Sequence, residues 1–133
     1  MEEKFIYKAK SMDKLKNWFQ PRYSKNRTEF LNFDEFYNWY STLPKVCYYC
    51  GLIEAELQEL IMTSKLTSKR FPEKGVSKQG KSRGQWLEFD RMHPEGKYSK
   101  ANCVLSCYFC NNDKSDIFTA EEYKHFFKTG LSI

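Results

Sequence analysis

Two Cys-x-x-Cys pairs restrict the possible folds of this chain more than any other feature of its sequence. The pairs, Cys47-Tyr-Tyr-Cys50 and Cys107-Tyr-Phe-Cys110, share one spacing, and each is followed by a turn-forming residue. In such turns both sulfurs point to the same side, so two turns that meet can supply the four thiolates that a structural zinc ion prefers. We predict that these four cysteines bind one zinc ion and thereby join distant segments of the chain.

Buried free thiols or a redox pair are the alternatives, but neither explains why both pairs have the same spacing. The fifth cysteine, Cys103, lies four residues before Cys107 and is interpreted as a small core residue. A zinc ion with four sulfur ligands has no open position for catalysis. Any chemistry in this protein therefore needs a second site.

Length and composition predict a single compact unit. A chain of 133 residues of which 17% are aromatic can bury a substantial core. No apolar run is long enough to span a membrane, and the sequence MEEKFIYKAK lacks the apolar region of a secretory signal. We therefore expect no membrane partner and a cytoplasmic location, where cysteines stay reduced and can bind zinc.

The basic residues are unevenly distributed, although the formal net charge is only +5. They are concentrated in residues 1–30 and again in residues 65–83, where Glu73 is the sole acid. Such clusters favour a polyanionic partner, and a solvated surface is the alternative interpretation. The residues of the second cluster predicted to contact nucleic acid are Lys69, Arg70, Lys74, Lys78, Lys81 and Arg83.

Residues 1–46 read as a basic and aromatic extension with helices. The segment 12–20 is a candidate short helix, which Pro21 is expected to end. A helix over 33–42 is predicted more firmly, because Asn32 and Glu35 have capping-box spacing and aromatic residues follow at helical intervals.

Residues 47–133 are predicted to form the second part of the same unit. An apolar stripe at helical spacing, Ile53, Leu57, Leu60 and Ile61, predicts a helix after the first cysteine pair. A long basic loop follows it, and then two short runs of strand-like composition around a turn-rich segment predict a β-hairpin. Thr119 and Glu122 predict the start of a last helix, with Gly130 at its end.

A set of oxygen ligands lies between and beside the cysteine pairs. Asp90 falls on the first predicted hairpin strand, Asn102 at the start of the second, and Asn111 at the start of the helix after it. A carboxylate with nearby amides suits a hard cation such as Mg²⁺, which keeps several waters and needs few protein oxygens. Glu88 and Asp113 are interpreted as solvated acids, and His125 as a structural residue of the last helix.

The order of these residues resembles the HNH, or His-Me finger, endonucleases. The shared pattern is Cys-x-x-Cys, then an aspartate, then Asn-x-x-x-x-Cys-x-x-Cys-Asn-x-x-Lys, and it covers residues 47 to about 128. The resemblance implies an α+β fold with a small ββα-metal core, to which this chain adds N-terminal helices. It also implies structural Zn²⁺, catalytic Mg²⁺ or Mn²⁺, and DNA as the partner, with RNA not excluded.

The resemblance assigns a role to four residues. Asp90 matches the metal-binding carboxylate, and Asn111 matches the helix residue that completes the metal site. Asn102 matches the middle asparagine, which fixes the loop and orients the catalytic base. Lys114 matches the lysine of the closing motif, and we predict that it joins the nucleic-acid contacts.

Arg91 is the departure from the family pattern, because the base histidine is expected at this position. A guanidinium cannot deprotonate water at neutral pH. If the strand continues, His93 lies on the same face as Arg91 and could act as the base, or a metal-activated water could serve instead, while Arg91 binds phosphate. The sequence thus predicts a variant metal-dependent endonuclease with Asp90, Arg91, His93 and Asn102 in catalysis. The alternative is an inactive zinc-stabilised module that binds nucleic acid or a protein.

Overall fold

A computed structural model describes residues 4–128 of the chain. The helices are α1 (Met12–Ser24), α2 (Phe33–Thr42), α3 (Glu54–Met62), α4 (Tyr108–Lys114) and α5 (Ala120–Tyr123), which continues as the π-helix η1 (Lys124–Lys128). The strands are β1 (Glu88–Arg91) and β2 (Cys103–Ser106). Among these residues, no helix is long and apolar enough to cross a membrane.

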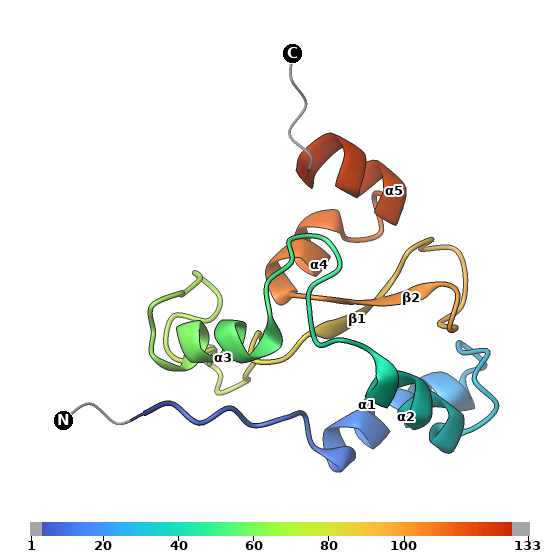
Figure 1. The fold of residues 1–133 in the computed structure, drawn as a ribbon, viewed down its shortest axis with the longest axis horizontal. Coiled ribbons are helices and arrows are strands. Elements are labelled where there is room, and N and C mark those ends of the chain that lie inside the picture. The colour runs from blue at the N-terminus through green and yellow to red at the C-terminus, as the bar shows by residue number, and fades with distance from the viewer. Residues whose placement is uncertain (1–3, 129–133) are drawn as a thin grey trace.

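The two strands form the antiparallel hairpin that the sequence predicted. Glu88 pairs with Ser106 and Arg91 with Cys103, and α4 begins directly after β2. In Figure 1 the hairpin lies between α4 and α5 on one side and α1 and α2 on the other, with α3 beyond one end. This is an α+β fold with a ββα unit, as predicted.

The first helix is longer than predicted. Pro21 was expected to end it, but α1 continues to Ser24 and contains the proline. The backbone N–H groups of Lys25 and Arg27 bind the carbonyls of Pro21 and Arg22, at 3.2 and 2.8 Å. These bonds complete a last turn after the proline, so the proline does not end the helix.

The second helix agrees with its prediction. It spans Phe33–Thr42, and the Asn32 side chain accepts a hydrogen bond from the Glu35 backbone at 2.9 Å. The capping box is incomplete, because the Glu35 carboxylate accepts from the Leu31 backbone at 3.4 Å and not from the Asn32 backbone.

The predicted stripe of α3 is wrong at one of its four residues, and Leu60 is only partly buried. Leu57 and Ile61 are buried as expected, but Ile53 is 45% exposed and Glu54 is buried in its stead. The Glu54 carboxylate accepts hydrogen bonds from the Leu87 backbone and from the Tyr7 hydroxyl. A buried carboxylate is tolerated when its oxygens are paired in this way. The partners come from distant segments, which helical periodicity cannot reveal.

Residues 4–46 share one hydrophobic core with the hairpin. The ring of Trp18 in α1 lies 4.3 Å from that of Phe89 in β1, and Phe36 in α2 lies 5.2 Å from the same ring. Offset and tilted aromatic pairs at such distances add to the free energy gained by burial. The N-terminal helices therefore pack against the ββα unit on the face of β1 that carries Phe89.

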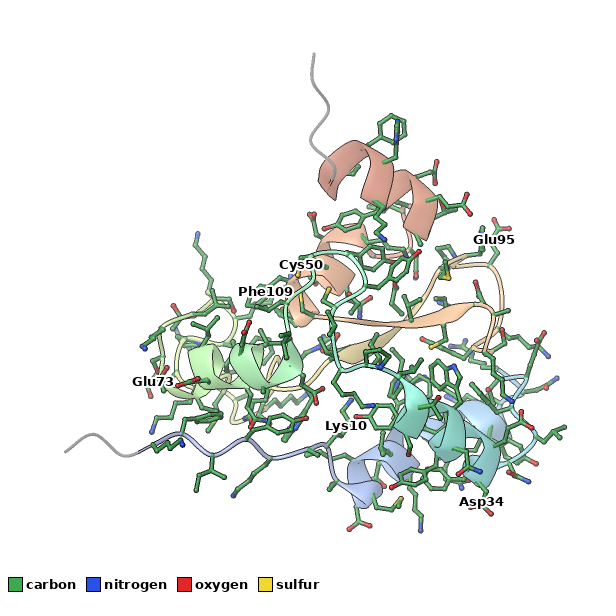
Figure 2. All side chains as sticks on the ribbon, viewed as in Figure 1. Lys10, Asp34, Cys50, Glu73, Glu95 and Phe109 are labelled. Carbon is green, nitrogen blue, oxygen red and sulfur yellow. The ribbon has the colours of Figure 1, made fainter. Side chains whose placement is uncertain are left out.

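The basic segment between α3 and β1 is a loop, as predicted, although it is folded onto α3. Gly75 has φ +73°, and a Cβ at this position would lie 2.8 Å from both the Arg83 carbonyl and Ile61 Cγ2. Only glycine combines this backbone conformation with so close an approach. In Figure 2 the loop, marked by Glu73, lies beside α3 at one end of the molecule.

The last helix begins where the sequence predicted. Thr119 and Glu122 form a complete capping box, with reciprocal hydrogen bonds of 2.9 and 3.2 Å. The chain then changes from α-helix to π-helix at Lys124. The predicted role of Gly130 lies outside the described residues.

Candidate functional site: a cysteine cluster and the Asp90 cavity

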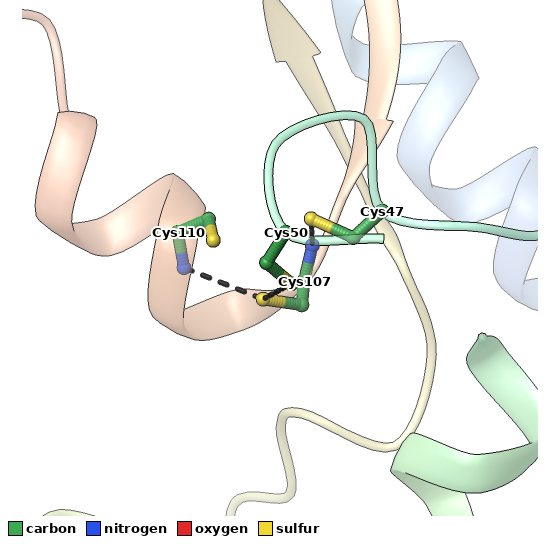
Figure 3. A group of neighbouring side chains, drawn as sticks. All are labelled: Cys47, Cys50, Cys107 and Cys110. Carbon is green, nitrogen blue, oxygen red and sulfur yellow. Dashed lines mark hydrogen bonds between the residues drawn. The ribbon is translucent and has the colours of Figure 1, made fainter. Parts of the chain in front are cut away.

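The four predicted ligands converge into one cluster. The sulfurs of Cys47, Cys50, Cys107 and Cys110 lie within 4.8 Å of one another. Figure 3 shows the first pair on a loop and the second pair at the start of α4. The Cys50 and Cys107 sulfurs are 3.9 Å apart. A tetrahedral ion with bonds of about 2.3 Å separates its sulfurs by roughly 3.8 Å, so the cluster fits a metal such as zinc.

Backbone N–H groups at the start of α4 favour thiolates in this cluster. Cys107 N–H donates to the Cys47 sulfur at 3.3 Å, and Cys110 N–H donates to the Cys107 sulfur at 3.4 Å. Hydrogen bonds from the thiols of Cys107 and Cys110 lower the pKa of Cys47, whereas hydrogen bonding within the cluster and burial raise the pKa values of Cys107 and Cys110. Metal binding requires deprotonated sulfur, so a metal ion would have to displace the remaining thiol protons. Cys103 lies outside the cluster and is 4% exposed, which agrees with its predicted place in the core.

Asp90 is buried on the face of β1 that α4 covers. It is 5% exposed. Its Oδ2 accepts a hydrogen bond from the Tyr49 hydroxyl, and its Oδ1 accepts one from the Lys114 ammonium at 3.2 Å. Burial raises the pKa of Asp90, while these two donors act in the opposite direction. The carboxylate is therefore held in one orientation by residues from both cysteine segments.

Lys114 corrects one of the predicted nucleic-acid contacts. Its side chain is 1% exposed, and its ammonium also donates to the carbonyls of Arg91 and Ser115, at 3.0 and 3.3 Å. An ammonium buried among these acceptors cannot reach a phosphate group. Its charge instead compensates the buried Asp90, since an unpaired charge is costly in an interior.

Glu88 was interpreted from the sequence as a solvated acid, but in the structure its carboxylate has two partners. It is half-buried, accepts from Asn111 Nδ2 at 2.9 Å, and forms two bonds of 2.7 and 2.9 Å with the Arg83 guanidinium. The hydrogen bond with Glu88 raises the pKa of Arg83. Asp113 likewise has a partner, because it accepts from the Tyr123 hydroxyl at 2.8 Å.

A cavity of about 280 Å³ brings the predicted catalytic residues partly together. Asp90, Arg91 and Asn111 line it, with Tyr98 and Asp116. Because the amide nitrogen of Asn111 is bound to Glu88, its carbonyl oxygen is left for an ion. A carboxylate and an amide oxygen beside open space fit a hard divalent ion that keeps most of its waters.

Arg91 is held at the edge of this cavity. Its guanidinium donates to the Gly96 carbonyl at 3.3 Å, lies 3.5 Å from the Asp116 carboxylate and stands 5.1 Å from the centre of the Tyr98 ring. The Asp116 carboxylate is 80% exposed, so this ion pair is weak and exchangeable. A phosphate group could take the place of Asp116.

His93 is not brought to the cavity. Strand β1 ends at Arg91, so the alternation that would place His93 on the same face does not extend to it. His93 is exposed in the turn that follows and is not among the residues that line the cavity.

Asn102 crosses the loop between the strands. Its Oδ1 accepts from the His93 backbone at 2.9 Å, and its Nδ2 donates to the carbonyls of His93 and Lys97, both at 3.1 Å. A Cβ on Gly96 would lie 2.8 Å from this Nδ2. Asn102 thus connects three points of the loop that carries Tyr98.

Sequence reasoning missed a second cavity of about 540 Å³ beside the first. Lys14, Trp18 and Arg22 of α1 form one wall, and Trp86 with Arg83 lies on another. The two cavities share Arg83, Tyr98 and Asn111 among their lining residues, so they adjoin. The i, i+4 spacing of Lys14, Trp18 and Arg22 was the available signal, because it places all three on one helix face.

One solved structure provides a comparison for this arrangement. The chain matches the rare-cutting HNH restriction endonuclease PacI with a TM-score of 0.60 and 27% sequence identity, over 86% of this chain and 71% of PacI. No protein-family model matches the chain, and no curated protein matches it significantly. The likeness to PacI supports the HNH fold and a function of the nuclease type.

Proposed function

We propose that this protein is a metal-dependent endonuclease that hydrolyses phosphodiester bonds in DNA. The observation that carries the proposal is the cavity in which Asp90, Arg91 and Asn111 meet. Asp90 and Asn111 stand at positions that the HNH motif gives to metal-binding residues, Arg91 stands at the position of its histidine, and the fold resembles that of a restriction endonuclease. DNA is the proposed substrate because PacI is a restriction endonuclease. RNA stays a substrate to test.

Asp90 and Asn111 would hold Mg²⁺ or Mn²⁺ through their free oxygen lone pairs. When bound, such an ion polarises a phosphate oxygen and lowers the pKa of a bound water. Arg91 would bind the phosphate with two donors, once Asp116 has been displaced, and stabilise the charge of the transition state. The cysteine cluster would hold Zn²⁺ and keep α4 in register with the hairpin.

The base is the part of the mechanism that the sequence left open between His93 and a metal-activated water. His93 lies in an exposed turn outside the cavity lining. We therefore propose that the attacking water in the cavity gives its proton to solvent and not to His93. Asn102 then acts through the loop, because its hydrogen bonds to His93 and Lys97 hold the segment that carries Gly96 and Tyr98 beside Arg91.

The proposed path of the DNA backbone runs along the second cavity. Lys10 and Lys14 lie at its α1 side, with the Lys10 ammonium also bound to the Leu87 carbonyl at 3.0 Å. Burial lowers the pKa of Lys10. Residues of the basic loop, Lys69, Arg70, Lys74, Lys78 and Lys81, are exposed and could extend this surface. Phosphate contacts of this kind position a duplex without reading its sequence.

Cleavage of supercoiled plasmid with Mg²⁺ or Mn²⁺ tests the proposal. We expect nicking or linearisation that EDTA abolishes and that Asn111→Ala lowers by roughly 10²-fold, as for the loss of a group that supports the metal site. Asp90→Asn should abolish it. The control is Asp34→Asn, which removes an exposed carboxylate from α2 that lines neither of the two cavities.

Arg91→His distinguishes a variant nuclease from an inactive binding module. If Arg91 binds phosphate, the histidine variant should cleave more slowly than the wild type. Restored or increased cleavage would mean that arginine merely replaced the family base. Binding of DNA without any metal-dependent cleavage by the wild type, across DNA and RNA substrates, would contradict the nuclease proposal and favour the binding module.

A further inference from the structure

A buried tyrosine connects the cysteine cluster to Asp90. Tyr49 lies between Cys47 and Cys50, so its backbone belongs to the turn that presents these two sulfurs. Its side chain is 6% exposed, and its hydroxyl donates to Oδ2 of Asp90. The mechanism proposed above makes no use of this residue.

Packing fixes the Tyr49 ring. The ring meets Tyr48 edge-on at 5.2 Å and Tyr123 edge-on at 5.1 Å. Tyr123 is itself 1% exposed and donates to Asp113 at 2.8 Å. The hydroxyl of Tyr49 is therefore a donor on a rigid support, whose place depends on the cysteine turn and on α5.

The two donors on Asp90 differ in what they can fix. A carboxylate offers about four lone-pair positions, of which Tyr49 takes one on Oδ2 and Lys114 takes one on Oδ1. Lys114 divides its donors among three acceptors. Tyr49 holds a single acceptor from a packed ring. The rotation of the carboxylate therefore depends most on Tyr49.

We propose that Tyr49 is a positioning residue for the divalent-ion site. It turns the remaining lone pairs of Asp90 toward the cavity, and it makes this orientation depend on the turn that carries Cys47 and Cys50. The role rests on the proposed function, because it takes Asp90 to be an ion ligand. Groups that orient a metal ligand in this way commonly change metal affinity or activity by about 10- to 100-fold.

Binding of Mn²⁺ to the zinc-loaded protein, measured by titration calorimetry without DNA, tests this role. Tyr49→Phe removes only the hydroxyl and should weaken Asp90-dependent Mn²⁺ binding by about 10-fold. Tyr48→Phe is the matched control, because it removes a hydroxyl from the neighbouring residue, which is 39% exposed. The control should bind Mn²⁺ within about twofold of the wild type, and both variants should retain their zinc.

Cleavage kinetics separate positioning from a purely structural role. In Tyr49→Phe the Mn²⁺ concentration for half-maximal cleavage should rise by about the same factor as the dissociation constant. The rate at saturating Mn²⁺ should stay close to that of the wild type. Unchanged Mn²⁺ affinity in Tyr49→Phe overturns the role of Tyr49 alone, as does loss of zinc or of the folded state. Failure of the wild type to bind Mn²⁺ through Asp90, with Asp90→Asn as reference, overturns the nuclease site as well.

Discussion

The cysteine cluster and the Asp90 cavity are assembled in different ways, although they share segments of chain. Each cysteine pair is a short turn whose spacing alone directs both sulfurs to one side, so only two such turns have to meet. The Asp90 cavity draws on β1, the hairpin loop, α4 and the residues after it. The first site is thus encoded locally, and the second depends on the packing of the whole unit.

The two sites also differ in how their charge is balanced. The sulfurs receive N–H donors from the start of α4 and face one another, which suits a dication bound by all four. Asp90 already has a cation, the Lys114 ammonium, at 3.2 Å. A divalent ion at Asp90 must therefore bind beside a fixed positive charge. We infer tight binding of metal at the cysteine cluster and weak, exchangeable binding at Asp90.

The largest expected effect comes from removing one ligand of the cysteine cluster. Cys107→Ser should abolish zinc binding and with it the folded state, because Cys107 is the N-cap of α4 and its sulfur accepts from Cys110 N–H. Elemental analysis and circular dichroism measure both. Cys103→Ala is the control: it removes a buried sulfur outside the cluster and should keep one zinc per chain. A folded, zinc-free Cys107→Ser protein would contradict the structural role of the cluster.

What the sequence predicted correctly follows the same division. The span of α2 and the Thr119 capping box rest on residues within about one turn of each other, and each Cys-x-x-Cys turn and each hairpin strand is likewise a local pattern. Local hydrogen bonds and fixed spacings determine such features. They can be derived from a single sequence because their partners are near neighbours.

What the sequence did not predict depends on contacts between distant segments. Tyr49 and Asp90 are 41 residues apart, and their hydrogen bond exists only because the hairpin packs against the cysteine turn. Lys114 was assigned to the nucleic-acid contacts through its match to the closing motif, and its burial beside Asp90 reversed that assignment. His93 was placed by an alternation that stops with the strand at Arg91.

A smaller effect is expected from removing positive charge from α1, which forms one wall of the second cavity. Lys14→Gln with Arg22→Gln removes two positive charges from the cavity wall. If both contact phosphate, the slope of log binding constant against log salt should fall by about two. Lys16→Gln with Lys25→Gln makes the same charge change at exposed residues outside that cavity and is the control. If both pairs lower the salt slope equally, α1 contributes only general positive charge and the cavity wall has no special role in DNA binding.

The basic loop provides a further comparison with α1. Lys78 and Lys81 are exposed and line neither the Asp90 cavity nor the one beside it. The pair Lys78→Gln and Lys81→Gln should therefore lower the salt slope less than the α1 pair does. A larger effect of the loop pair would place the main phosphate contacts at the loop, as the sequence had predicted, and away from the α1 cavity.

The smallest expected effect tests whether His93 takes part in catalysis at the cavity. His93→Ala should change the cleavage rate by less than about threefold, because the ring is exposed and lies outside the cavity lining. A general base is worth roughly 10²- to 10⁴-fold, so a loss of that size would restore His93 to the mechanism. Asn102→Ala is the comparison variant. It removes the three hydrogen bonds that fix the loop, so it should slow cleavage more than His93→Ala does. If His93→Ala instead slows cleavage more than Asn102→Ala does, the loop positions His93 for catalysis when DNA binds. The site would then extend beyond the cavity around Asp90.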